Sequence, residues 1–304
     1  MRKNRELKVI QVDAFTDTPF GGNPAAVILG ADRLSNQMMQ KIASEMNVRE
    51  TVFVSNSKVA DFSFRYWTPR SEIDFSGHST IAAFHALVEE GLLEVVHDVN
   101  MVSLETKAGV LAIETMKNES TGIHEIQITH QKPQFLDTYD PKKYAEALGL
   151  TLADILSPNP VQTVSTGIPH LIIPLSTMKS MERIKPNWDR LETLRKDADY
   201  VSIQVFTRDV KEVTSDAHAR HFAPGLGVNE DPVTGSGAAA MGSYMIRYGL
   251  MEPTIPVTSI VVEQGHFVNR PGRIYVEVQG DQEEIIQVKV SGTGVTVMKG
   301  RLIL

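Results

Sequence analysis

Two stretches of the chain place polar residues directly before a glycine-rich helix start. They are SEIDFSGHSTIAAFHALVEEGLLE (71–94) and NEDPVTGSGAAAMGSYMIRYGLME (229–252). The first backbone N–H groups of a helix have no partner within the helix, and the helix dipole gives them partial positive charge. Glycine lets a ligand approach the backbone closely. The pattern therefore predicts a cradle for an anion such as a carboxylate at each helix start.

The two stretches match each other when Gly77 is placed on Gly235. The matched pairs are Ser76 with Thr234, His78 with Ser236, and Glu105 with Glu263. Two further segment pairs match at slightly different offsets: FRYWTP (64–69) with ARHFAP (219–224), and GNPAAVI (22–28) with GIPHLII (167–173). These matches indicate an internal duplication whose period is too long for a solenoid. We therefore expect two similar halves that face each other.

Charged and polar residues near the helix starts are candidates for chemistry. Asp231 lies four residues before Gly235, and Pro232 constrains the backbone after it. His78 is the second residue of the first helix. Glu50 opens an apolar strand in NVRETVFV, an unfavourable place for a charge without a partner.

A purely structural interpretation of the same residues remains open. Ser76 and Thr234 would then be N-caps, and the glycines would only ease packing. His78 would be a partly buried capping residue, and Glu50 a solvated loop acid.

Composition excludes several classes of protein. With 304 residues, 42% hydrophobic and 22% charged, the chain has the profile of a soluble globular protein with room for two domains. A net charge of −7 without a basic run argues against nucleic-acid binding. No apolar run approaches the ~20 residues of a membrane span. We see no signal peptide in MRKNRELKVIQVDAF and expect a cytoplasmic protein.

The sequence also lacks the usual signs of a cofactor or metal. The absence of cysteine excludes disulfides, thiolate–metal sites and a cysteine nucleophile. His78 and His85 are too far apart on one helix to share a metal, and His218 and His221 are expected on opposite faces of a strand. Neither a P-loop nor a dinucleotide-binding fingerprint is present. We therefore expect no metal and no cofactor.

Short strands alternate with a few helices along the chain. A helix is predicted over 35–46 with Ser35 as its N-cap. The stretch 132–160 is polar and includes Pro141, Pro158 and Pro160, and we expect a connection there with one short helix at 142–149. The last strand, 295–304, is expected to return to the first domain.

Four motifs in this order resemble the PhzF-like family of phenazine-biosynthesis isomerases: VDAFTDTPFGGNPAAVIL, RETVFV, FRYWTPRSEIDFSGHSTIAAFHAL and NEDPVTGSGAAAMGSYM. A later segment, EQGHFVNRPGRIYVEV, resembles a further stretch of the family. The resemblance implies the α+β fold of diaminopimelate epimerase, with two pseudo-symmetric domains that each wrap a mostly antiparallel sheet or barrel around a central helix. We expect an N-terminal domain over 1–130 plus 294–304 and a C-terminal domain over 131–293, with the active site between them.

The resemblance also assigns roles to residues. It implies that Glu50, His78 and Asp231 are catalytic, and that the substrate-binding residues are Ser76, Gly77, Gly235 and Ser236. The family's reference reaction isomerises trans-2,3-dihydro-3-hydroxyanthranilate, and a glutamate moves the proton between ring carbons without a metal or organic cofactor. Glu50 has no acidic counterpart in the repeat, which fits a specialised role.

This chain departs from the family pattern at two positions. Ser76 stands where many relatives have cysteine, and what this does to activity does not follow from the sequence. Gly237 completes GSG where GSA is commoner, a change that we expect to be tolerated.

The cysteine-free helix starts restrict the chemistry. Related epimerases and proline racemases use two cysteines, and this chain has Ser76 and Thr234 at those places. An unactivated hydroxyl has too high a pKa to act as a base near neutral pH. Two-base racemisation is therefore excluded, and one-base proton transfer by Glu50 is the predicted mechanism.

The expected substrate is a small cyclic or amino-substituted carboxylate, whose identity and pathway the sequence does not reveal. His78 and Asp231 would hold its polar groups and stabilise developing charge. Two other functions remain open: a non-catalytic carboxylate-binding protein, and a lyase or hydrolase on the same fold. We also expect a homodimer.

Overall fold

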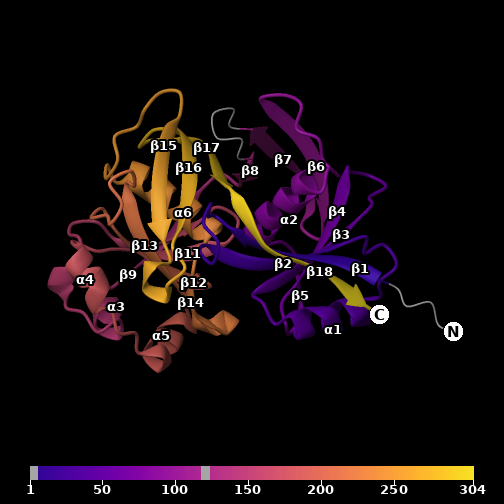
Figure 1. Cartoon of the computed structure of the whole chain (residues 1–304). Coiled ribbons are helices and arrows are strands. Elements are labelled where there is room, and N and C mark those ends of the chain that lie inside the picture. Colours follow the sequence, from indigo (N-terminus) through magenta and orange to yellow (C-terminus); the bar gives the residue numbers. More distant parts are fainter. Residues whose placement is uncertain (1–5, 118–123) are drawn as a thin grey trace. The chain divides into compact units, whose positions relative to one another are not determined.

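The computed structural model describes residues 6–117 and 124–304, which divide into two compact units (Figure 1). Unit 1 comprises Met1–Ile128 and Ser291–Leu304, and unit 2 comprises Thr129–Val290. The domain bounds expected from the sequence lie a few residues from these.

Unit 1 contains a mixed sheet, a central helix α2 and a covering helix α1. Its helices are α1 (Asn36–Met46) and α2 (Gly77–Glu89). Its strands are β1 (Glu6–Ala14), β2 (Asn23–Leu29), β3 (Glu50–Ser55), β4 (Phe62–Trp67), β5 (Glu72–Ile73), β6 (Val99–Thr106), β7 (Gly109–Lys117), β8 (His124–His130) and β18 (Gly294–Ile303).

The strands of unit 1 pair in a defined order and direction. The strand β1 is antiparallel to β2 and β18, and β2 is parallel to β3. Next, β3 is antiparallel to β4, which is antiparallel to β5 and parallel to β6. The hairpin of β6 and β7 continues antiparallel to β8. The chain's last strand therefore lies beside its first.

Unit 2 contains the second central helix, α6, and three shorter helices. Its helices are α3 (Pro141–Ala147), α4 (Met178–Arg183), α5 (Trp188–Arg195) and α6 (Gly235–Arg247), with the short 3₁₀ turns η1 (Leu152–Asp154), η2 (Pro224–Leu226) and η3 (His266–Val268). Its strands are β9 (Gln134–Tyr139), β10 (Val161–Ser165), β11 (Pro169–Pro174), β12 (Ser202–Thr207), β13 (Ala217–Ala223), β14 (Val228–Asp231), β15 (Thr258–Gln264), β16 (Gly272–Gly280) and β17 (Ile285–Gly292).

The pairing pattern of unit 1 recurs in unit 2. Strands β10 and β11 are antiparallel, β11 and β12 parallel, and β12 and β13 antiparallel. Then β13 is antiparallel to β14 and parallel to β15, which is antiparallel to β16. The strands from β1 to β7 in unit 1 follow the same order of antiparallel and parallel pairings. This agreement confirms the prediction of two similar halves.

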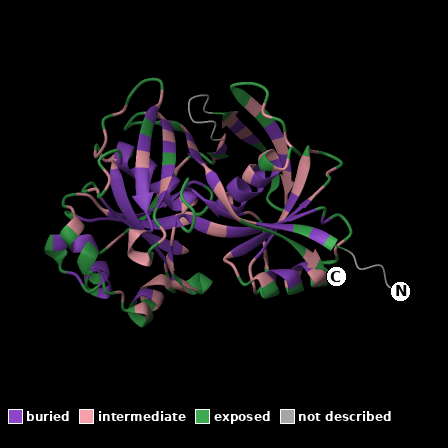
Figure 2. Cartoon of the chain, viewed as in Figure 1, coloured by how far each residue is buried: buried purple, intermediate pink, exposed green. Residues whose placement is uncertain are grey.

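Each central helix is buried because its sequence is apolar or small on most sides. The sequences are GHSTIAAFHALVE in α2 and GSGAAAMGSYMIR in α6, and Figure 2 shows both helices mostly buried. Helix α2 packs against β1, β2, β3 and β18, and α6 packs against β10, β11, β12 and β16. At Gly242 a Cβ would lie 2.9 Å from Val276 Cγ1, so glycine allows α6 to approach β16 closely.

The prediction of a connection over residues 132–160 is wrong in part, because β9 lies there and pairs with β10. Four of the six β9 side chains are exposed, so its apolar alternation is weak, and the pairing with β10 stabilises it. The sequence analysis also missed α4 and α5. They are short, their N-caps are Thr177 and Asn187, and residues of both pack onto the apolar core of unit 2.

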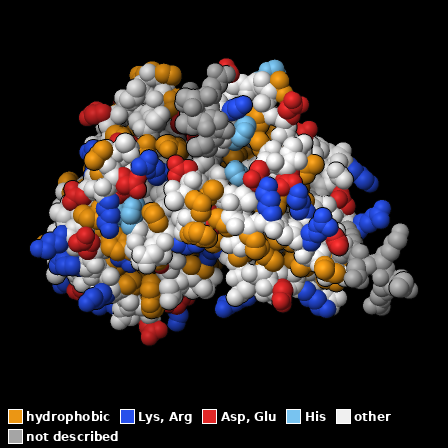
Figure 3. All heavy atoms as spheres, viewed as in Figure 1, with side chains coloured by type: hydrophobic (Ala, Val, Ile, Leu, Met, Phe, Trp, Pro, Cys, Tyr) orange, Lys and Arg blue, Asp and Glu red, His pale blue; other side chains and the backbone are white. Residues whose placement is uncertain are grey.

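No helix among the described residues has the length and apolar character needed to cross a membrane. On the face drawn in Figure 3, basic and acidic side chains are interspersed. That face therefore offers no basic groove of the kind that binds nucleic acid.

The turn after β15 gives a test of the fold. Gly265 has φ +92, and a Cβ there would lie 2.1 Å from the carbonyl oxygen of Arg270. We expect Gly265→Ala to lower the free energy of unfolding by about 2 kcal/mol or more, because alanine is strained in this conformation and clashes with backbone. Urea unfolding measures the loss. Gly300→Ala is the control, since a Cβ there meets no heavy atom within 4 Å. Equal unfolding midpoints for the two variants would contradict this turn geometry.

Candidate active site

In unit 1 the carboxylate of Glu50 lies against the start of α2. Glu50 is the first residue of β3 and is only 7% exposed. Its Oε2 atom accepts hydrogen bonds from Ser76 Oγ and, at 3.0 Å, from Ser79 Oγ. His78 Nε2 lies 3.4 Å from the same oxygen. The structure thus brings together three residues that the sequence analysis selected, and adds Ser79.

All contacts recorded for Glu50 among the described residues fall on Oε2. A carboxylate has two oxygens that can each accept hydrogen bonds. Among the described residues, no side chain donates a hydrogen bond to the other oxygen, Oε1. Gly77, the first residue of α2, leaves space open at the helix start, since a Cβ there would meet no heavy atom within 4 Å.

The N-cap hydroxyls of both central helices bond to acids and not to the helix backbone. Ser76 and Thr234 occupy the N-cap positions of α2 and α6, but neither side chain makes a cap hydrogen bond. Ser76 Oγ donates to Glu50, and Thr234 Oγ1 donates to Asp231 Oδ2 at 2.5 Å. The interpretation of these two hydroxyls as structural caps is therefore wrong, and the first-turn N–H groups receive no acceptor from them.

A buried tyrosine supports the first turn of α2. Tyr66 OH lies 2.7 Å from Thr80 Oγ1, which donates to the carbonyl of Ser76 at 2.6 Å. Burial raises the pKa of Tyr66, the bond with Thr80 opposes this, and the charge of Glu50 raises it further. Tyr66 thus stays a neutral phenol and holds the turn that carries Ser76. Tyr66 lies in the FRYWTP segment that the sequence analysis matched with unit 2, but that match did not indicate this contact.

In unit 2 a glutamine ties the Asp231 segment to α6. Asp231 is 4% exposed at the end of β14. Gln264 Nε2 donates to the Asp231 carbonyl at 3.0 Å and lies 3.2 Å from Thr234 Oγ1. Gln264 belongs to the EQG segment that resembles the family, but the sequence analysis gave it no role.

Two buried histidines lie beside the start of α6 in unit 2. His170 Nε2 lies 3.0 Å from Ser236 Oγ, so the predicted substrate-binding serine has a protein partner. His221 Nδ1 lies 2.7 Å from Gln204 Oε1. At Gly237 a Cβ would lie 2.4 Å from that same oxygen. A Cβ at Gly237 would therefore force the Gln204 side chain, which is paired with His221, to shift. The expectation that GSG is tolerated stays a prediction.

The duplication relates Glu50 to a serine in unit 2. The match of GNPAAVI with GIPHLII places Ala25 on His170. Ala25 is opposite Glu50 in the parallel β2–β3 register, and His170 is opposite Ser202 in β11–β12. Ser202 is thus the repeat counterpart of Glu50. The sequence alone showed only that the acid has no acidic counterpart.

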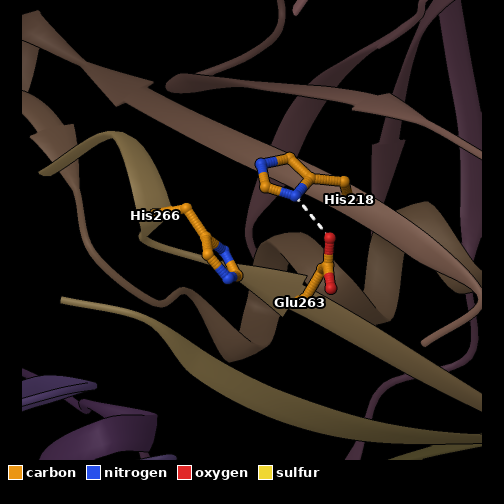
Figure 4. A group of neighbouring side chains, drawn as sticks. All are labelled: His218, Glu263 and His266. Carbon is orange, nitrogen blue, oxygen red and sulfur yellow. Dashed lines mark hydrogen bonds and ion pairs between the residues drawn. The ribbon is translucent and has the colours of Figure 1, made fainter. Parts of the chain in front are cut away.

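Three side chains of a type that binds metals gather elsewhere in unit 2 (Figure 4). They are His218, Glu263 and His266, and their ligand atoms lie within 4.8 Å of one another. Glu263 Oε1 is 2.7 Å from His218 Nδ1, and backbone N–H groups of Lys211 and Glu212 donate to its two oxygens at 2.6 and 2.9 Å.

Because these backbone donors belong to the loop between β12 and β13, Glu263 anchors that loop. A cation bound to the Glu263 carboxylate would have to displace them. Burial by itself raises the pKa of Glu263, but the bonds from His218, Lys211 and Glu212 outweigh it and lower the pKa to about 2. The repeat counterpart Glu105 accepts a bond from Ser57 at 2.6 Å in the loop between β3 and β4. The expectation that the chain binds no metal stays a prediction.

Comparison with known proteins shows the family of the chain. The sequence model described as phenazine biosynthesis-like protein matches residues 12–300. This chain belongs to the PhzF-like family. It is 36% identical over 305 residues to an uncharacterized isomerase of Clostridium acetobutylicum, with 99% of both chains covered. It is also 36% identical over 302 residues to an uncharacterized isomerase of Bacillus subtilis, again with 99% of both covered.

Solved structures show the same family and fold. The phenazine biosynthesis protein of the PhzF family from Bacillus anthracis superposes with a TM-score of 0.89 at 34% identity, covering 99% of this chain and 100% of that one. A hydroxyproline epimerase from Agrobacterium vitis, solved with trans-4-hydroxy-L-proline, has a TM-score of 0.63 at 14% identity, covering 100% and 94%. The second likeness concerns the fold alone. The predicted family and the α+β, epimerase-like fold class are confirmed.

The Glu263 anchor predicts a pH dependence of stability. A pKa lowered from 4.5 to about 2 in the folded state adds stability that is complete above pH 4.5 and is lost as the pH falls toward 2. Glu263→Gln should therefore cost roughly 2–3 kcal/mol near pH 7, and the gap to the wild type should narrow in acid. Urea unfolding at a series of pH values measures it. The control is Glu277→Gln, on β16. A gap that is constant with pH would contradict the assignment.

Proposed function

We propose that this chain is a cofactor-independent isomerase that moves a proton between two carbons of a small carboxylate, with Glu50 as the single general acid and base. One observation carries the proposal. The buried Glu50 carboxylate is held through Oε2 by Ser76 and Ser79, with His78 beside it, and its Oε1 atom accepts no recorded bond from the described residues. An anchored carboxylate with one available oxygen is suited to repeated transfer of one proton.

The proposed reaction has two steps on one face of the substrate. Glu50 Oε1 first takes a proton from a carbon next to an electron-withdrawing group, and the C–H electron pair enters the conjugated system as an enolate-type intermediate. The protonated Glu50 then returns the proton to another carbon of that system. The product has the same atoms and oxidation level as the substrate.

The proposal uses the two helix starts for binding. The first-turn N–H groups of α2 and α6, with Gly77 and Gly235, bind the carboxylate and the developing negative charge. His78 and Asp231 hold the amino or hydroxyl groups of the substrate.

The relatives support an isomerase. Two curated relatives carry the name uncharacterized isomerase, and the Bacillus anthracis structure is named as a phenazine biosynthesis protein. The hydroxyproline epimerase suggests a racemase-type reaction on the same fold, but this chain has no cysteine for a two-thiol mechanism. A homodimer is part of the proposal, and light scattering would test it.

Proton NMR in D2O tests the reaction. A pool of cyclic and amino-substituted carboxylates, including trans-2,3-dihydro-3-hydroxyanthranilate, is incubated with the wild type and with Glu50→Gln. We expect deuterium entry or rearrangement with the wild type and a rate at least about 100-fold lower with the variant, because general acid–base catalysis contributes that much.

The control for this experiment is Glu105→Gln, which changes a carboxylate of unit 1 that contacts Ser57 and lies outside the Glu50 cluster. It should react like the wild type. Equal rates for Glu50→Gln and the wild type would remove Glu50 from the mechanism. Binding of a carboxylate without any exchange would favour the non-catalytic alternative.

A further inference from the structure

A chain of three polar side chains runs through unit 2 to the start of α6. His170 on β11 lies between two serines: its Nδ1 atom is 2.7 Å from Ser202 Oγ, and its Nε2 atom is 3.0 Å from Ser236 Oγ. His170 and Ser202 are each 2% exposed, whereas Ser236 is only partly buried. The chain thus connects a buried serine with the serine predicted to bind substrate.

Proton counting gives the direction of these hydrogen bonds. Within the described residues, His170 is the one recorded hydrogen-bond partner of Ser202. A buried hydroxyl proton without an acceptor costs about 1–3 kcal/mol, and an unfilled lone pair is tolerated better. Ser202 therefore donates to His170 Nδ1, and Nδ1 carries no proton.

A neutral imidazole then has its proton on Nε2. Burial lowers the pKa of His170 well below its usual range, and His221 and His130 lower it further, so the ring is neutral near pH 7. The Nε2–H group donates to Ser236 Oγ. Since Ser236 accepts this bond, its own hydroxyl proton points elsewhere, and no other bond is recorded for it among the described residues.

The duplication places this chain where unit 1 has its carboxylate. Ser202 is the repeat counterpart of Glu50, and Ser236 is the counterpart of His78. In unit 1 the residue on the strand is Glu50, whose carboxylate is a hydrogen-bond acceptor. Its Oε2 atom lies 3.4 Å from His78 Nε2. In unit 2, Ser202 donates a hydrogen bond to His170, and His170 donates one to Ser236 at the start of α6.

We infer that Ser202 and His170 orient the Ser236 hydroxyl as a hydrogen-bond donor, so that the start of α6 accepts a carboxylate oxygen of a substrate and disfavours a protonated amine, which has no lone pair to accept the bond. The first-turn N–H groups of α6 are donors too, so they and the Ser236 hydroxyl favour the same kind of ligand atom, an acceptor oxygen. The inference rests on the proposed function for the role of Ser236 in substrate binding. His170 and Ser202 are positioning residues, since they act through Ser236.

NMR of ring-¹⁵N-labelled histidine tests the direction without any substrate. Two-bond ¹H–¹⁵N spectra identify the protonated ring nitrogen, and His170→Gln assigns the signal by its loss. We expect the Nε2–H form in the wild type and in Ser202→Thr, which keeps the hydroxyl. Ser202→Ala removes the donor to Nδ1 and should increase the Nδ1–H form. A wild-type His170 protonated at Nδ1 would overturn the inference.

Titration with anthranilate, a small amino-substituted carboxylate, tests the consequence for binding. Ser236→Ala and His170→Phe should each weaken binding by roughly tenfold or more, because each removes or misdirects a hydrogen bond to a charged group. Ser202→Thr should restore the affinity that Ser202→Ala loses. The control is Ser243→Ala, which removes a buried hydroxyl of α6 that bonds only to the Ala239 carbonyl among the described residues, at 2.8 Å.

The two tests separate this inference from the proposed function. Nε2–H at His170 with weaker anthranilate binding by Ser236→Ala supports the inference, even if Glu50→Gln keeps its exchange activity and the proposed catalysis fails. Unchanged binding by Ser236→Ala, or no saturable binding by the wild type, overturns the carboxylate assignment whatever Glu50 does.

Discussion

The candidate site depends on one constraint, namely that the hydroxyl at the start of each central helix bonds to an acid and does not cap the helix backbone. Ser76 and Thr234 stand at N-cap positions, yet they donate to Glu50 and Asp231. An acid is stabilised near a helix N-terminus by the partial positive charge of the first turn. The same arrangement leaves the first-turn N–H groups without acceptors from these side chains. A buried acid and a group of anion-binding donors are therefore held side by side in each unit.

The duplicated scaffold supports two different local chemistries. Strand pairings repeat in order and direction, so equivalent positions reach equivalent places beside α2 and α6. In unit 1 that position is Glu50, a carboxylate that can accept a proton. In unit 2 it is Ser202, which with His170 can only direct a proton toward Ser236. In the function proposed above, the position beside α2 moves the proton and the position beside α6 takes part in binding, so one symmetric fold would serve two different tasks.

Close packing around the helix starts fixes these side chains. Gly237 allows Gln204 and His221 to pack against the first turn of α6, and Gln264 joins the Asp231 backbone to Thr234. In unit 1 the Tyr66–Thr80 pair holds the corresponding turn of α2. Such buried polar networks are stable only when nearly every donor finds an acceptor, so they restrict side-chain orientation strongly. None of these partners is close in sequence to the residue that it positions, apart from Thr80.

The sequence by itself determined the duplication, the family, the two central helices and the residues at their starts, because these follow from local patterns: glycine and small residues, helical spacing and ordered motifs. It also identified Glu50 as the residue that breaks the repeat. Tertiary structure alone decided that Ser76 and Thr234 bond to acids, that Ser202 is the counterpart of Glu50, and that His170 contacts Ser236. Tertiary structure also decided that β9, α4 and α5 form. Their sequence patterns are weak, and contacts with β10 and with the apolar core of unit 2 stabilise them. The physical reason is common to all of these cases. Side-chain hydrogen bonds across strands depend on register and distance, and neither is encoded in the spacing of residues along one segment.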